Sequence, residues 1–136
     1  TNPEHSEGAC VPVPMFPERI TKMKVINPND MAAQAVTEEG ACDVSIRWLI
    51  SKPEGAPNFA MRHFELAPGG FTPLHTHAWE HEAFILEGAG EVTTADGPVA
   101  VKAGDAVYVA PEDLHQFRNT GDGVMKMLCV IPLPKG

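Results

Sequence analysis

Turn-forming residues recur at short intervals from residue 42 onward, and this spacing is the strongest constraint on the fold. Clusters such as residues 52–55, 67–70 and 119–123 separate short runs that are rich in Val, Ile, Phe and Met. Short strands that follow one another about every eight to twelve residues, joined by turns this tight, pair antiparallel in a sandwich or barrel. The sequence therefore predicts an all-β domain with strands at 42–51, 59–66, 72–77, 82–87, 91–94, 99–101, 106–109, 115–119 and 124–131.

Length and charge limit the size of the protein and the kind of partner it binds. A chain of 136 residues fits one domain. Its 10 Lys and Arg residues stand against 18 Asp and Glu, for a net charge of -8. A phosphate-binding surface needs clustered basic residues, so nucleic acid and anionic membranes are not expected as partners. We expect instead a small-molecule substrate.

The sequence also bears on location. No run of about 18 apolar residues could span a bilayer, and no signal-like segment opens the sequence. Cys10, Cys42 and Cys129 follow neither a zinc-binding nor a disulfide pattern, so we expect reduced thiols. Both features favour a cytoplasmic protein.

The N-terminal segment differs from the remainder. Residues 1–20 contain four prolines and little apolar alternation, which predicts an extended arm that is either disordered or laid against a partner subunit. The barrel domain is expected at 21–136, and the arm together with the need to cover sheet edges favours a homodimer. Residues 22–26 are expected to form a strand, and Asn27 to cap a brief helix from Pro28 through Ala35.

Histidine placement is the strongest chemical signal. The chain has six histidines, and His75, His77 and His81 fall within seven residues. In a strand, residues two apart share a face, so His75 and His77 would aim their imidazoles at one point. His81 follows after a short turn that can return it to the same face. His115, in another predicted strand, is a fourth candidate for the cluster. The alternative is a pair of solvated surface histidines, which are ordinary on an outer strand face.

Two segments around these histidines resemble the paired motifs of the cupin superfamily, and the resemblance extends over about residues 22–132. In the second segment, Ala110 and Glu112 stand where cupins have Pro and Gly. The resemblance implies a double-stranded β-helix, the cupin or jelly-roll barrel, in a single domain. The first motif is matched by Gly69, His75, His77, His81 and Gly88, and the second by Gly104, His115 and Asn119.

His81 occupies a position where most cupins have glutamate. Glu82 is the alternative ligand, but it leaves five residues before Gly88 where the motif has six, whereas His81 satisfies both spacings. The choice also fixes which residues of that strand face the barrel interior. With His81, the sequence resembles the small single-domain monocupins whose metal, usually manganese, is held by four histidines.

That resemblance implies one divalent ion per chain, bound by His75, His77, His81 and His115. Manganese is expected first, with iron, nickel, copper or zinc as alternatives, because imidazole affinity alone does not select manganese. Four neutral ligands leave the ion's charge uncompensated and make it a stronger Lewis acid. On zinc, four imidazoles could instead close a tetrahedral structural site.

The residues of the pocket follow from strand alternation. Cys129 and Phe117 are expected in an apolar pocket or in the barrel core, and Arg62 points either into the barrel, to hold an anionic substrate, or into solvent. His63 lies on the face opposite Arg62. No acid or base can be placed in the pocket, so the catalytic residues are unknown.

Three functions are compatible with this pattern. The first is a Mn(II)- or Fe(II)-dependent oxidoreductase of the dioxygenase type. The second is a redox-neutral isomerase or lyase, and the third is a non-catalytic barrel that binds a small ligand. The missing acid or base favours the oxidative reaction.

Overall fold

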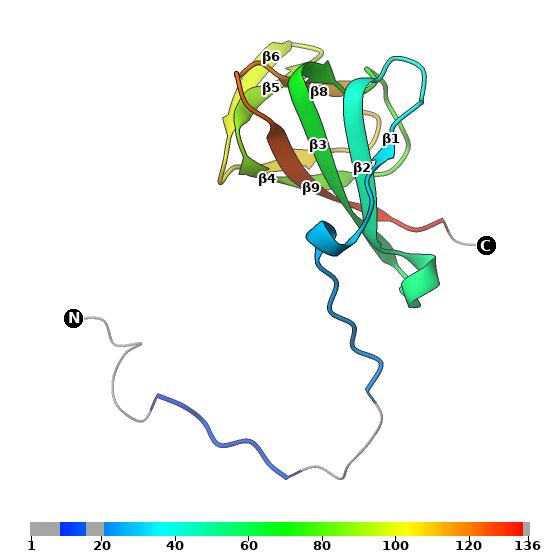
Figure 1. Cartoon of the computed structure of the whole chain (residues 1–136), viewed down its shortest axis with the longest axis vertical. Coiled ribbons are helices and arrows are strands. Elements are labelled where there is room, and N and C mark those ends of the chain that lie inside the picture. Colours follow the sequence, from blue (N-terminus) through cyan, green and yellow to red (C-terminus); the bar gives the residue numbers. More distant parts are fainter. Residues whose placement is uncertain (1–8, 16–20, 135–136) are drawn as a thin grey trace.

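Antiparallel strands form one sheet that curls around a common interior (Figure 1). The computed structural model describes residues 9–15 and 21–134. Its path of paired strands is β6-β5-β8-β3-β9-β4-β7, and β2 and β1 continue from β3. The strands are β1 (Gln34–Ala35), β2 (Cys42–Ile50), β3 (Phe59–Phe71), β4 (His81–Glu87), β5 (Ala89–Thr94), β6 (Gly97–Lys102), β7 (Ala106–Val109), β8 (His115–Asn119) and β9 (Met125–Pro132).

Helical structure in the described ranges is limited to two 3-10 turns, η2 (Pro28–Asp30) and η3 (Lys52–Glu54). No helix in this part of the chain is long and apolar enough to cross a membrane. The all-β barrel expected from the turn spacing is therefore confirmed.

The core lies inside the curled sheet and is built by strand alternation. In β4, His81, Ala83 and Ile85 are buried, while the residues between them are exposed. Leu66 and Ile85 have no exposed surface, and each such side chain stabilises the fold by about 1.5–3 kcal/mol. The core comprises Val44, Ile46, Phe64, Leu66, Ala83, Ile85, Val92, Val101, Val109, Phe117, Met125, Met127 and Cys129.

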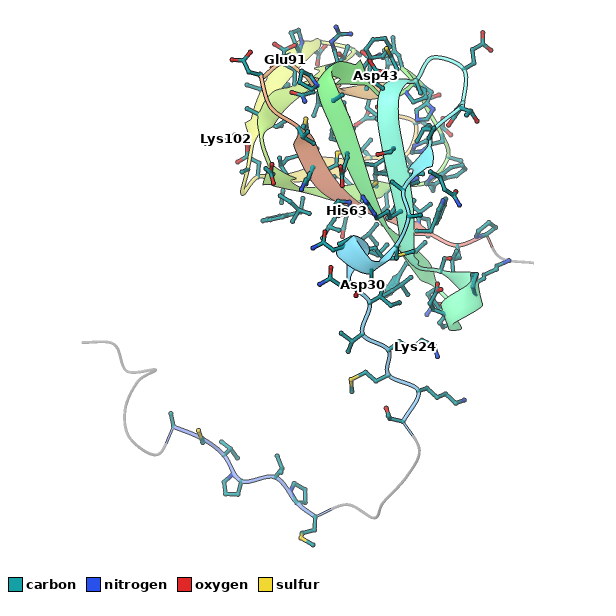
Figure 2. The ribbon with its side chains drawn as sticks, in the orientation of Figure 1. Lys24, Asp30, Asp43, His63, Glu91 and Lys102 are labelled. Carbon is teal, nitrogen blue, oxygen red and sulfur yellow. The ribbon has the colours of Figure 1, made fainter. Side chains whose placement is uncertain are left out.

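The segment before the barrel corrects two expectations. Residues 22–26 form no strand, and Figure 2 shows Lys24 on the exposed segment below the barrel. Asn27 does cap the following turn, because its side chain accepts a hydrogen bond from the amide of Asn29 at 2.8 Å. The helix expected through Ala35 stops at Asp30, since η2 buries no side chain and Ala35 instead pairs with Ser45.

The expected arm lies partly outside the described residues. Residues 9–15 have no regular secondary structure, and Val11, Val13 and Met15 are more than four-fifths exposed. Residues 1–8 and 16–20 fall outside the described ranges, so the boundary at residue 20 stays a prediction.

The strand expected at residues 72–77 is also absent. β3 continues through the predicted turn at 67–70 and ends at Phe71. Its pairing register with β2 shifts there, because four residues of β3 stand opposite the single residue Asp43. Asp43 has a φ of 53°, and a Cβ on Gly70 would lie 2.8 Å from its carbonyl oxygen. The bulge thus needs glycine, and the chain leaves the sheet only after Phe71.

Candidate metal centre

Three separate segments bring the histidine cluster together. His75 and His77 lie on the loop between β3 and β4, whereas His81 and His115 are the first residues of β4 and β8. The loop is fastened to β8 by a two-way bridge between the backbones of His75 and His115, at 3.2 and 3.1 Å. The amide of Glu112 also donates to the carbonyl of His77 at 2.7 Å. The convergence expected from the sequence is present, although a loop produces it.

Three of the four imidazoles are close enough to share an ion, and the ring of His81 lies beside them. Ring nitrogens of His75, His77 and His115 all lie within 4.8 Å of one another. The ring of His81 lies 4.2 Å from that of His77 and 5.2 Å from that of His115, measured between centroids. Two nitrogens at about 2.1 Å from one ion stand at most about 4.2 Å apart, so a small contraction would suffice.

Hydrogen bonds on one side of two rings determine which nitrogen is free. Nδ1 of His77 bonds to the carbonyl of Trp79, and Nδ1 of His115 to the carbonyl of Asp113, both at 2.8 Å. A carbonyl oxygen only accepts, so Nδ1 donates and the lone pair of the neutral ring lies on Nε2. Both Nε2 atoms are buried without a hydrogen-bond partner. Two buried lone pairs that face a common space are what a metal ion requires.

The other two rings have partners on the same side. Nδ1 of His75 lies 3.9 Å from a carboxylate oxygen of Glu38. Nδ1 of His81 lies 3.5 Å from the sulfur of Cys129. Three of the four rings are therefore hydrogen-bonded through Nδ1 from outside the cluster, as metal-binding histidines commonly are, and His75 has a carboxylate nearby.

Three of the histidines, His75, His81 and His115, are held in the neutral form that ligation needs. Burial lowers the pKa of His75 and His115 below the usual value of 6.5. Burial, Arg62 and the neighbouring histidines together lower the pKa of His81 to about 3. These three residues can thus bind a metal ion near neutral pH without first losing a proton.

An apolar cavity of about 320 Å³ opens beside the cluster. Its wall includes His75, His81 and His115, so a molecule in the cavity lies against the histidines. The three pocket residues predicted from the sequence, Arg62, Phe117 and Cys129, all line this cavity. The structure therefore directs Arg62 into the barrel.

Two further polar residues define what belongs to the site. Glu82 is exposed and lines a separate depression with Phe59 and Val130, so its side chain faces away from the histidines. Glu38 lines the cavity and was not identified from the sequence. It lies in the loop between β1 and β2, and only the fold brings it next to His75.

Comparison with known proteins agrees with this architecture. A family model described as a cupin domain matches residues 62–131, half of the chain. The chain belongs to the cupin family. The match confirms that the two segments containing the histidines resemble cupin motifs.

Individual cupins of similar sequence have varied activities. The structure of the polyketide cyclase RemF from Streptomyces resistomycificus superposes with a TM-score of 0.77 at 35% identity, covering 81% of this chain and 79% of that one. An oxalate-binding protein from Thermotoga maritima is 32% identical over 120 residues, which are 86% of this chain and 87% of that protein.

A third relative matches only in part. The 1-methylthio-D-xylulose 5-phosphate methylsulfurylase of Rhodospirillum rubrum is 34% identical over 71 residues, 52% of this chain. The chain spans about half the length of two of the proteins it matches, this enzyme (46%) and a protein of Methanocaldococcus jannaschii (50%).

Proposed function

We propose that the protein is a metal-dependent enzyme in which His75, His77, His81 and His115 bind one divalent ion beside the apolar cavity. The observation that carries the proposal is the pair of buried, unpartnered Nε2 atoms on His77 and His115, with their Nδ1 atoms already bonded to carbonyls. The resemblance to the four-histidine monocupins supports manganese(II), with iron(II), nickel(II), copper(II) and zinc(II) as alternatives.

The reaction favoured by the pocket is redox-neutral catalysis on a carbonyl-containing apolar substrate. When bound, a divalent ion polarises a substrate oxygen and stabilises negative charge that develops on it. Glu38 lines the cavity beside His75, and its carboxylate is the group there that could take a proton from the carbon beside the carbonyl. Glu38 supplies the base whose absence weighed against this reaction in the sequence. The polyketide cyclase among its relatives also supports a redox-neutral reaction.

The second candidate is the Mn(II)- or Fe(II)-dependent oxidoreductase of the dioxygenase type that the sequence predicts. It is supported by the position of three histidines in the cavity wall, which leaves space for both an organic substrate and dioxygen next to the cluster.

Elemental analysis of untagged protein, with matched variants, tests the metal site. We expect about one manganese per chain, lost in His115→Gln and retained in His63→Gln. His63 is a suitable control because it is also buried, 5% exposed, and lies outside the cavity. Retention of the metal in His115→Gln would overturn the site.

The reaction is tested with acetophenone in deuterated buffer. Faster exchange of its methyl protons without oxygen, lost in His115→Gln, supports the redox-neutral enzyme. Oxygen uptake with an aromatic substrate supports the dioxygenase instead. A metal-loaded protein that shows neither overturns both and indicates a ligand-binding barrel.

We further infer that the protein is a homodimer in a reducing compartment such as the cytoplasm. The exposed apolar side chains of Val11, Val13 and Met15 support a subunit contact through the arm. Pro12 and Pro14 alternate with these residues and have no backbone N–H group. In an extended segment the remaining N–H groups all point to one side, as on an edge strand. The free thiols of Cys10, Cys42 and Cys129 support the compartment.

A further inference from the structure

Arg62 occupies an unusual position in the wall of the cavity. It lies on β3 between its cross-strand neighbours Trp48 on β2 and Cys129 on β9. The guanidinium carbon stands 5.5 Å from the centroid of Trp48 and 5.0 Å from that of Phe64. These contacts hold the planar group in one orientation toward the cavity.

The charge of Arg62 has no counter-ion among the described residues. Its Nη2 donates to the sulfur of Cys129 at 3.0 Å, a weak acceptor, and its Nε is buried with no hydrogen-bond partner. Arg47, one strand away, shows the contrast, because it bonds to the carboxylate of Glu65 at 2.6 Å and to the carbonyl of Met31 at 3.0 Å. A partly buried guanidinium with an unused donor is costly unless a ligand completes it.

The cavity itself does not supply that ligand. Glu38 is the carboxylate in its described lining, and it lies beside His75, with a carboxylate oxygen 3.9 Å from Nδ1. The remaining wall near Arg62 is apolar, formed by side chains such as Ile46, Phe64 and Met127. A molecule that fits must therefore combine an apolar body with a negative group.

We propose that Arg62 forms an anion subsite, so that the cavity takes an aromatic or aliphatic molecule bearing one carboxylate or phenolate oxygen group. Nε and Nη2 lie on one side of the guanidinium and can both donate to such a group, with Nη2 leaving the sulfur of Cys129. The inference rests on the proposed function in one respect, that the remainder of the ligand lies beside the histidines. It names the substrate class for that site.

Calorimetric titration with benzoate and with benzamide, its uncharged isostere, tests the subsite. We expect benzoate to bind about tenfold or more tightly than benzamide, because a charge-assisted pair is about twice as strong as a neutral one. The preference is expected in chelator-treated protein and in manganese-loaded protein alike. Arg62→Met should reduce benzoate binding to the level of benzamide, and Arg62→Lys should fall between.

Arg118→Met is the matched control. Arg118 also lies over an aromatic ring, 5.1 Å from the centroid of Phe71, but it is outside the cavity. We expect this variant to keep the preference for benzoate. Thermal unfolding of both variants identifies any loss that comes from misfolding.

A spectroscopic readout locates the anion. The chain has two tryptophans, and Trp79→Phe leaves Trp48, which contacts Arg62, as the reporter. Benzoate should shift the emission of Trp48 where benzamide does not.

Equal binding of the two probes, or an unchanged preference in Arg62→Met, would overturn the subsite. So would a preference that appears only after manganese is added, because the anion would then bind at the metal. A preference that persists in protein unable to bind manganese would support the subsite while the proposed function fails.

Discussion

The indole of Trp79 lies face to face with the imidazole of His77, with ring centroids 4.5 Å apart and planes 4° from parallel. The carbonyl of the same tryptophan accepts from Nδ1 of that ring. One residue thus fixes both the tilt and the hydrogen-bonding side of a candidate ligand that no strand holds.

Trp79→Ala should weaken metal binding while keeping the carbonyl bond. An aromatic pair contributes about 0.5–1.5 kcal/mol, so the manganese affinity should fall by a factor of about 2 to 10. The paramagnetic resonance signal of free manganese measures this. Trp48→Ala, which removes an indole outside the cluster, should leave the affinity unchanged, and an equal loss in both variants would contradict the role of the stack.

Glu38→Gln should abolish most of the proton exchange proposed above. A positioned general base contributes about 10²–10⁴-fold, so the rate per bound manganese should fall by about that factor. Glu39→Gln is the matched control, because Glu39 is the adjacent acid and does not line the cavity. Equal rates in the two variants would show that Glu38 is not the general base.

The stability of the metal-free protein should depend on pH through His81. Its pKa of about 3 in the folded state lies below the unfolded value of about 6.5, so between these values the unfolded chain binds the extra proton. The unfolding free energy should therefore decline as pH falls from 7 to 5, by up to about 1.4 kcal/mol per pH unit for each such histidine. Urea unfolding of chelator-treated protein measures the slope.

His81→Asn separates this contribution from those of His63, His75 and His115, whose pKa values burial also lowers. The slope should become shallower in the variant. A slope identical to that of the unmodified chain would mean that His81 takes up a proton in the folded state.

Gly70→Ala should destabilise the barrel at the bulge of β3. The added Cβ would lie 2.8 and 2.9 Å from the carbonyl oxygens of Asp43 and Cys42, so the backbone must move, at a cost of about 1–3 kcal/mol. Chemical denaturation measures the loss. Gly123→Ala, where no atom lies within 4 Å of the new carbon, should change stability far less.

The homodimer should depend on the arm. Replacing Val11, Val13 and Met15 together by serine removes the exposed apolar side chains and should convert a particle of twice 14.6 kDa into one of 14.6 kDa by light scattering. Val124→Ser, an exposed residue of the barrel, serves as the control. A dimer that survives the triple change would exclude the arm as the main contact.

Sequence reasoning found most strands because their alternation and turns are local. It failed at residues 67–77, where Pro68, Gly69 and Gly70 signal a turn. Pairing of Phe71 with Cys42 and Arg118 keeps this stretch in β3 instead. Local sequence signals do not include the stability gained from such long-range pairing. The same limit explains the expected helix after Pro28, since the pairing of Ala35 with Ser45 depends on a strand ten residues away.

The candidate site was predictable where a motif or strand phase specified it. The burial of His81 and the exposure of Glu82 follow from alternation in β4. The orientation of Arg62 did not, because both faces of β3 contain polar residues. Glu38 had no signal at all, since its loop has no motif and only the folded barrel brings it to His75.

The division of the cluster between loop and strands has a consequence for how such proteins diverge. His75 and His77 lie on a loop that pairs with the sheet only through the bridge of His75 to His115 and a few further backbone bonds, whereas His81 and His115 begin strands. Substitutions at the loop positions can change the number and chemistry of the donors without breaking a strand ladder. The set of donors in the cluster can therefore change one residue at a time while the strand pairing of the barrel stays the same.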